Sequence, residues 1–201
     1  TRPGGMAEYV VAPEKTVFNL DDLSFEVGAF MEPLSCVVHG VERADVRLAD
    51  RVAIVGAGPI GLLLLQVIQR QGAASITVAE RQPARLDLAR SFGADRVVPS
   101  ADALGQDAYD VVVDATGAVT MMSRTLTWVR RGGTILLFGV PPRDSQLTLD
   151  AFSLFEKGVT VRSSFTSVRN SYQALALLRS EQVEVAPLIS HRLPLEAFER
   201  G

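Results

Sequence analysis

A chain of 201 residues can bury one sizeable core, and 47% hydrophobic with 21% charged residues is the composition of an ordinary globular domain. The net charge of −3 disfavours nucleic acid as the main partner, because binding to backbone phosphates requires a concentrated basic face. The apolar run at 60–67 is far too short to cross a bilayer, and a single cysteine, Cys36, excludes an internal disulfide or a zinc site of several cysteines within this sequence. We therefore expect a reduced, cytoplasmic setting, with neither nucleic acid nor membrane as a partner.

In chain order, the sequence opens with strand-like residues at 6–11 that need pairing partners. Asp22 and Ser24 are candidate N-caps and Pro33 can begin a helical turn, so we expect one or two helices within 21–44. Strands and helices then alternate. We expect strands at 51–55, 75–79, 96–98, 110–114, 133–138 and 159–163, and helices at 59–71, 83–92, 119–130, 151–157 and 171–180. The final "LEAFERG" resembles a helix that begins as the sequence stops, which predicts a piece of a longer protein.

Three of the expected strands are unbroken apolar runs: "VAIV", "VVV" and "ILLF". Such runs are typical of strands that are covered on both faces, as in a parallel sheet flanked by helices. Regular alternation of strands and helices, joined by right-handed crossovers, predicts a doubly wound α/β domain of the Rossmann type.

The stretch "GAGPIG" lies where the first of these strands would turn into a helix. A GxGxxG pattern alone is a weak signal, since glycine-rich turns are common at such junctions. Gly56 would permit the sharp turn, Gly58 would let a pyrophosphate approach the backbone, and Gly61 would let the helix pack closely on its strand. Pro59 is favourable in the first helical turn, whose free N–H groups and positive end attract a diphosphate. Because a strand precedes the motif, a helix follows it and an acidic residue ends the next strand, dinucleotide binding is the favoured interpretation.

That acidic residue, Glu80, can accept hydrogen bonds from both hydroxyls of an adenosine ribose and would repel a 2′-phosphate, which favours NAD over NADP. Arg81 beside it could pair with a 2′-phosphate or stack on adenine, or it could be a solvated surface charge. Arg85, in the following helix, could reach the ribose or could equally be a surface arginine. The predicted cofactor is therefore NAD, with NADP as the alternative.

Two further strand ends are candidate contacts for the nicotinamide half of the cofactor. They are "DATG" at 114–117, which includes Thr116, and "FGV" at 138–140. In an open parallel sheet the ligand lies beyond the carboxyl ends of the strands, where the backbone groups of these segments would be placed. The alternative is that Gly117 and Gly139 are only turn residues.

Together, "EPLSCVVHG", "DRVAIVGAGPIGLLLLQV", "AERQPARLDLARSFGAD", "DATG" and "GGTILLFGV" resemble the zinc-containing medium-chain alcohol dehydrogenase family, in particular its polyol (sorbitol-type) and threonine dehydrogenase branch. The resemblance spans nearly the whole chain. It implies a barrel-like catalytic domain that carries zinc, beside a Rossmann domain that binds the nicotinamide cofactor. The positions that match the family's cofactor-binding residues are Gly56, Gly58, Pro59, Ile60, Gly61, Glu80, Arg85, Phe138, Gly139, Val140, Ser164 and Phe165. Glu32, in "MEPLS", matches a glutamate that lies beside the catalytic zinc in this branch.

Part of the family pattern is absent from this sequence. The zinc-binding cysteine and the Gly-His-Glu motif that precede the segment resembling "GGMAEYVV" are not present, and neither is the four-cysteine structural zinc loop. The resemblance therefore implies remnants of the catalytic domain at 1–22 and 188–201, around an NAD-binding Rossmann domain at 23–187. Thr166 stands where sorbitol-type enzymes carry an arginine near the substrate, which puts a strict sorbitol specificity in doubt.

Glu32, Cys36 and His39 lie one helical turn apart on an expected helix and could suggest a metal site. Apolar neighbours favour packing for Cys36 and His39. A catalytic zinc requires three protein ligands and an open position, which this sequence does not supply. Only Glu32 keeps a near-metal prediction, and zinc is expected in the intact enzyme alone.

The resemblance implies an enzyme that transfers hydride from a secondary alcohol of a polyol or related small molecule to NAD, with zinc polarising the alcohol oxygen. This chain by itself is expected to bind NAD without turnover. Three alternatives stay open: a non-catalytic NAD-sensing module, threonine 3-dehydrogenase-like oxidation of an amino alcohol, and a methyltransferase, which also has a glycine-rich first turn. We expect a homodimer or homotetramer, with "VTVRSSF" at 159–165 as a candidate interface.

Overall fold

The computed structural model describes residues 5–200, except for the side chains of Phe198 and Arg200. Within that range the strands are β1 (Arg51–Val55), β2 (Ser75–Ala79), β3 (Arg96–Val98), β4 (Tyr109–Asp114), β5 (Val129–Leu137) and β6 (Thr160–Ser163). They form one parallel sheet in the order β3-β2-β1-β4-β5-β6. The chain enters at the centre, builds to one edge, returns to the centre and builds to the other edge. This order confirms the predicted doubly wound α/β fold.

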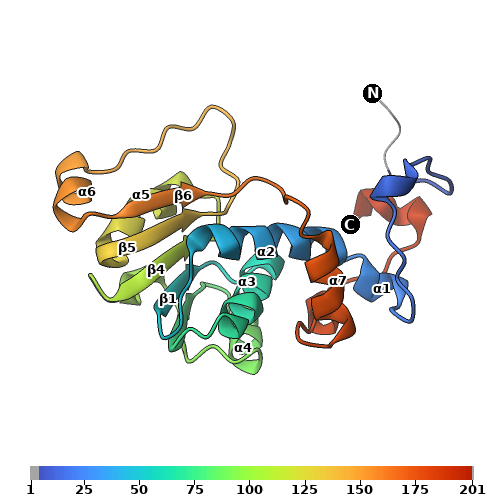
Figure 1. Ribbon diagram of the computed structural model, residues 1–201, viewed down its shortest axis with the longest axis horizontal. Helices are drawn as coiled ribbons and strands as arrows, with labels where there is room; N and C mark the ends of the chain where they lie inside the picture. Colours follow the sequence, from blue (N-terminus) through green and yellow to red (C-terminus); the bar gives the residue numbers. More distant parts are fainter. Residues whose placement is uncertain (1–4, 201) are drawn as a thin grey trace.

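Helices cover both faces of the sheet (Figure 1). The α-helices are α1 (Phe25–Gly28), α2 (Met31–Ala44), α3 (Pro59–Arg70), α4 (Pro83–Ser91), α5 (Val119–Trp128), α6 (Ala151–Lys157) and α7 (Ser171–Arg179), and the 3-10 helices are η1 (Glu14–Thr16), η2 (Ala101–Ala103), η3 (Ala186–Leu188) and η4 (Leu195–Arg200). One hydrophobic cluster joins α2, α3, α4 and α7 to the sheet, and a second cluster on the opposite face includes α5 and α6. None of the helices within 5–200 is long and apolar enough to cross a membrane.

The central strand β1 shows why the apolar runs are unbroken. Val52 and Ile54 face the cluster that contains α3, whereas Ala53 and Val55 face the cluster that contains α5. A strand buried on both faces has no position left for a polar side chain. Each fully buried valine or isoleucine stabilises the fold by about 1.5–3 kcal/mol, so these strands form a rigid base for the loops at their carboxyl ends.

The junction between α5 and β5 differs from the prediction. We expected the helix to continue to Arg130 and the strand to begin at Gly133, but β5 already begins at Val129 and its register against β4 shifts near this point. Gly132 has a φ of +69°, and a Cβ at Gly133 would lie 2.7 Å from the carbonyl oxygen of Asp110. The two glycines therefore form a bulge inside the strand, which periodicity alone does not reveal.

The strand expected at 6–11 is wrong. These residues form bends and irregular backbone, and Tyr9 and Val11 are 89% and 95% exposed. A strand needs a neighbour to receive its backbone hydrogen bonds, and no described segment pairs with this one.

The two ends of the described chain lie together, away from the sheet (Figure 1). Arg192 forms an ion pair with Glu26, and Arg179 of α7 pairs with Asp21 at 2.5 Å. The helix expected at the end of the sequence is present as η4. The domain boundaries at 22 and 188 stay a prediction.

Candidate functional site

The carboxyl end of β1 turns into α3 through Gly56, Ala57 and Gly58. Gly56 has a φ of +100°, a left-handed conformation that glycine adopts without strain. A Cβ at Gly61 would overlap the carbonyl oxygen of Gly56, so the helix packs directly on the turn. A Cβ at Gly58 would meet no atom within 4 Å. Two glycines therefore serve the geometry of the turn itself, and the space beside the third is open to a ligand.

The amino end of α3 faces this open space. Gly58 is the N-cap without a side-chain cap, Pro59 occupies the first turn, and Ile60 packs partly against the core. The first N–H groups of a helix have no intrahelical partner, and a helix of 12 residues carries a partial positive charge at this end. An anion such as a phosphate group satisfies both.

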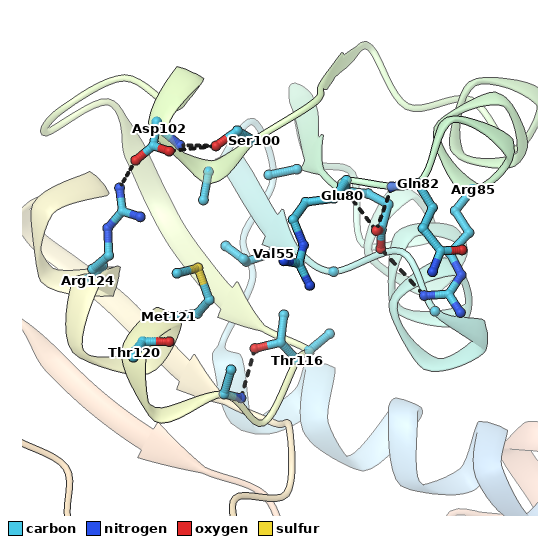
Figure 2. Close-up of a pocket in the computed structure, with 17 residues that line it drawn as sticks. Val55, Glu80, Gln82, Arg85, Ser100, Asp102, Thr116, Thr120, Met121 and Arg124 are labelled. Carbon is cyan, nitrogen blue, oxygen red and sulfur yellow. Dashed lines mark hydrogen bonds and ion pairs between the residues drawn. The ribbon is translucent and has the colours of Figure 1, made fainter.

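The carboxylate of Glu80 follows β2 and reaches across to the glycine turn (Figure 2). Its Oε2 accepts a hydrogen bond from the N–H of Ala57 at 2.9 Å, and its Oε1 accepts from the N–H groups of Arg81 at 2.7 Å and Gln82 at 3.0 Å. The Arg85 guanidinium lies 3.8 Å from Oε2. Burial by itself raises the pKa of Glu80, but these donors and the arginine outweigh it, so the pKa of Glu80 lies below its ordinary value. Glu80 is therefore an anion held in place by backbone N–H groups of the glycine turn and of its own loop.

A pocket of about 760 Å³ begins at this turn and runs along the carboxyl ends of the strands. Its walls are the glycine turn, the loop at 80–85, the segment at 100–102 and the first turns of α5 (Figure 2). The pocket brings together the predicted cofactor residues Gly56, Gly58, Glu80, Arg81, Arg85 and Thr116. A volume in the range of small-molecule sites, with an anion-binding helix end next to a carboxylate, suits an elongated ligand that carries a phosphate and a polyhydroxylated ring.

Asp114, the last residue of β4, fixes the loop on the far side of the glycine turn. Its side chain is fully buried and accepts hydrogen bonds from the hydroxyl of Thr116 at 2.6 Å and from the N–H of Gly117 at 3.1 Å. Burial raises the pKa of Asp114, although these hydrogen bonds act in the opposite direction. The Thr116 hydroxyl in turn accepts from the N–H of Ala118 at 3.0 Å. The sequence predicted a backbone contact for the segment at 114–117, but no role for the Asp114 carboxylate. The signal that could have revealed that role is an acidic residue at the end of the apolar run "VVV".

The loops after β4 and β5 pack tightly on each other. A Cβ at Gly139 would overlap the backbone of Gly117, and a Cβ at Gly117, whose φ is +71°, would lie 2.5 Å from the carbonyl oxygen of Val140. Both glycines are thus required by close packing of two backbones. This geometry explains the turn residues without a ligand, so their predicted contact with nicotinamide stays a prediction.

The other residues predicted for the nicotinamide half do not line the pocket. The ring of Phe138 packs beneath Gly40 of α2, where a Cβ would overlap it. Val140 and Phe165 are 88% and 86% exposed. The hydroxyl of Ser164 is buried and has no hydrogen-bond partner within residues 5–200. The structure therefore brings the adenosine half of the predicted site together with Thr116, and the other predicted nicotinamide contacts do not line this pocket.

The profile of the family described as "Zinc-binding dehydrogenase" matches residues 59–180 of this chain. The chain belongs to the zinc-binding dehydrogenase family. This chain is 34% identical to D-altritol 5-dehydrogenase of Agrobacterium fabrum, over 96% of this chain and 59% of that enzyme. It is 29% identical to L-threonine 3-dehydrogenase of Idiomarina loihiensis, over 100% of this chain and 61% of that enzyme.

Among solved structures, this zinc-binding dehydrogenase chain resembles a protein described as a zinc-binding dehydrogenase from Sinorhizobium meliloti 1021, bound to NADP. The TM-score is 0.93 with 30% identity, over 99% of this chain and 62% of that chain. The chain thus spans about three fifths of the length of its relatives. The family resemblance seen in the sequence is confirmed.

The part of the zinc-binding dehydrogenase chain that the structure describes does not supply a zinc site. No group of three histidine, cysteine or acidic side chains there could hold a metal ion. Glu32 is exposed on α2, where its Oε1 accepts a weak hydrogen bond from the Sγ of Cys36 at 3.6 Å. Burial, and then the neighbouring Glu32, raise the pKa of the Cys36 thiol, which disfavours the thiolate that binds metals. Glu32 and Cys36 do not form a zinc site by themselves, and a near-metal role for Glu32 stays a prediction.

Proposed function

We propose that this chain is the nicotinamide-dinucleotide-binding part of a dehydrogenase that transfers hydride from a secondary alcohol to NAD. The observation that supports the proposal best is the continuity of one pocket from the open amino end of α3 to the carboxylate of Glu80. A diphosphate and a ribose have complementary chemistry to these two groups. Two relatives are named as dehydrogenases of hydroxyl-bearing compounds, D-altritol and L-threonine.

In this proposal the residues of the chain bind and orient the cofactor. The free N–H groups at the amino end of α3 hold the diphosphate. Glu80 accepts hydrogen bonds from the ribose hydroxyls, while the N–H of Ala57 keeps its Oε2 in place. Asp114 and Thr116 hold the loop opposite the turn. The bound nicotinamide ring supplies the hydride acceptor. Contacts to it from Gly139, Val140, Ser164 and Phe165 are part of the proposal.

We propose NAD as the preferred cofactor. A 2′-phosphate would approach the fixed anion Glu80, and like unit charges about 4 Å apart repel by ~4 kcal/mol at an effective dielectric constant near 20. Arg81 and Arg85 on the same rim would offset part of that repulsion. The Sinorhizobium relative is bound to NADP, so the ratio of the two affinities is the quantity to measure.

For the whole protein we propose a polyol or related small secondary alcohol as substrate, because the altritol enzyme is 34% identical. The second candidate, an amino alcohol, is favoured by the likeness to the threonine enzyme. Zinc, a near-metal role for Glu32, a cytoplasmic setting and a homodimer or homotetramer belong to the same proposal. Because β6 is an edge strand and Val161 on it is 38% exposed, the segment at 159–165 supports pairing between two copies.

Calorimetry with NAD, NADP and S-adenosylmethionine tests the proposal on the chain as it stands. We expect NAD to bind more tightly than NADP, and we expect no binding of S-adenosylmethionine. In a separate activity assay, the chain should show no steady alcohol-dependent formation of NADH. Gly58→Val should lower NAD affinity at least tenfold, since the added side chain fills the open space beside the turn. Gly5→Val is the matched control, because a Cβ at Gly5 also meets nothing within 4 Å. Binding of S-adenosylmethionine alone, or equal NAD affinity in Gly58→Val, would overturn the proposal.

A further inference from the structure

The end of the pocket farthest from α3 carries a charged pair that the proposed function does not use. Asp102 lies in η2, after β3, and Arg124 lies in α5; both line the pocket and they form an ion pair (Figure 2). Ser100 donates a hydrogen bond from its hydroxyl to Oδ2 of Asp102 at 2.7 Å and accepts one from the N–H of Asp102 at 3.1 Å. The Arg124 guanidinium lies over the ring of Trp128, 5.2 Å from its centroid. Both charged groups are thus held from two sides.

The order of sites along the pocket indicates what this pair would face. The inference rests on the proposed function, which assigns the diphosphate to the amino end of α3 and the ribose to Glu80. Figure 2 shows Met121 between Glu80 and the pair of Asp102 and Arg124, and Ala101 also lines the pocket. In a dinucleotide, the group on the far side of the ribose from the diphosphate is the base. Small and apolar side chains there suit the faces of a flat ring, and the charged pair suits its polar edge.

We infer that Asp102 and Arg124 read the polar edge of adenine and select it against other purines. Adenine presents an exocyclic amino donor beside ring-nitrogen acceptors. A carboxylate is an acceptor with lone pairs to spare after its bonds to Ser100 and Arg124, and a guanidinium has five N–H donors. Hypoxanthine carries an oxygen in place of the amino group and a proton on the neighbouring nitrogen, so its carbonyl would face the carboxylate. With Asp102 facing the substituent at the 6-position, the pair is complementary to adenine and mismatched to hypoxanthine.

A second ion pair in the same domain provides a matched comparison. Asp87 and Arg90 pair at 2.5 Å on α4, and the side chain of Asp87 is 74% exposed, the same fraction as that of Asp102. Neither Asp87 nor Arg90 lines the pocket. If exposed ion pairs of this kind only adjust surface charge, substitution of either aspartate should have the same effect on the preference between dinucleotides.

The test compares NAD with nicotinamide hypoxanthine dinucleotide by calorimetry, on the chain and on two variants. We expect the unmodified chain to prefer NAD roughly tenfold, the usual scale for one hydrogen bond to a charged group. Asp102→Ala should reduce that preference to roughly twofold or less, whereas Asp87→Ala should keep it. Asp102→Asn should still bind NAD, but its preference for NAD over the hypoxanthine dinucleotide should be smaller, because an amide can also donate a hydrogen bond to the hypoxanthine oxygen.

The outcomes separate this inference from the function on which it rests. An unchanged preference in Asp102→Ala, or an equal loss in Asp87→Ala, would overturn the adenine-reading role while leaving NAD binding in place. Equal affinity of the unmodified chain for the two dinucleotides would also overturn the adenine-reading role without contradicting NAD binding. Failure of the unmodified chain to bind either dinucleotide would overturn the proposed function and this inference together. Circular dichroism of each variant, which should match the unmodified chain, shows that a changed preference does not come from misfolding.

Discussion

The two halves of the predicted cofactor site differ in how completely the chain builds them. Around the amino end of α3, Glu80 is hydrogen-bonded to the glycine turn and Asp114 to the loop at 116–117, and these segments line or support one pocket. Around the ends of β5 and β6, Val140 and Phe165 are exposed and the Ser164 hydroxyl has no partner within the described range. The difference indicates that the adenosine half is organised by the sheet itself, because its groups belong to neighbouring strands β1, β2 and β4. The other half depends on groups that the described residues do not bring together.

The largest expected effect comes from breaking the organised half at its tightest contact. Gly61→Ala should destabilise the fold by about 3 kcal/mol, because the Cβ would overlap the carbonyl of Gly56 and force α3 off its strand. Gly58→Ala should cost about 1 kcal/mol or less, since its Cβ meets nothing and only the N-cap preference is lost. Urea unfolding measures both, and equal losses would contradict the packing role assigned to Gly61.

Asp114→Ala should have the next largest effect, about 2 kcal/mol at neutral pH, because the Thr116 hydroxyl and the Gly117 N–H lose their buried acceptor. Asp144→Ala, in the exposed loop after β5, should change stability by no more than about 0.5 kcal/mol. NAD affinity should fall in the first variant and stay constant in the second. A stable Asp114→Ala chain with full affinity would show that the loop does not need the carboxylate.

The pH dependence of stability should have opposite signs at Glu80 and Asp114. Because the pKa of Glu80 is lowered by folding, its contribution is present above the unfolded value of about 4.3 and is lost as the pH falls through the folded value. The pKa of Asp114 is raised, so stability falls as the pH rises from about 3.9 through its folded value. Urea unfolding between pH 3 and 7 measures the free energy of unfolding. Compared with the unmodified chain, Glu80→Gln should lose less stability as the pH falls, and Asp114→Asn should lose less stability as the pH rises. The same slope of unfolding free energy against pH in both variants would contradict the opposite pKa shifts assigned to Glu80 and Asp114.

The smallest expected effect lies in the less organised half. Thr166 is exposed and β-branched, yet has a φ of +56°, where asparagine is accommodated more easily. Thr166→Asn should therefore stabilise the chain by about 0.5–1 kcal/mol, measured by thermal unfolding. Thr160→Asn is the control, since Thr160 is an exposed residue in the extended strand β6 and should gain nothing. Destabilisation by Thr166→Asn would show that the threonine makes a contact that outweighs its strain.

Most of the fold could be predicted because its signals are local. The apolar run of β1 and the glycine spacing after it indicate a strand, a turn and a helix within a few residues, and the structure confirms them. Glu80 was found in the same way, as an acidic residue at the end of the next strand. The backbone of Asp114 was part of the predicted segment at 114–117, but the role of its carboxylate was not predicted, because that role comes from complete burial among hydrogen-bond donors and depends on how the loop closes over it.

The errors have physical causes of the same kind. The residues at 6–11 have strand-like side chains, but a strand also requires a partner, and none lies beside them in the described chain. The bulge at Gly132 and Gly133 was invisible because it depends on the approach of Asp110 from β4. The pair of Asp102 and Arg124 joins residues 22 positions apart, a contact that neither residue's neighbours indicate.

By itself the sequence determined the doubly wound sheet, the glycine turn and the ribose-side carboxylate, because each is encoded by hydrophobic periodicity or by residues close together in the chain. Only the tertiary structure decided which predicted residues share a pocket, where a buried carboxylate fixes a loop, and which charged pair lies at the far end of that pocket. These features arise when loops from separate strands converge at the carboxyl edge of the sheet, and local spacing carries no information about that convergence.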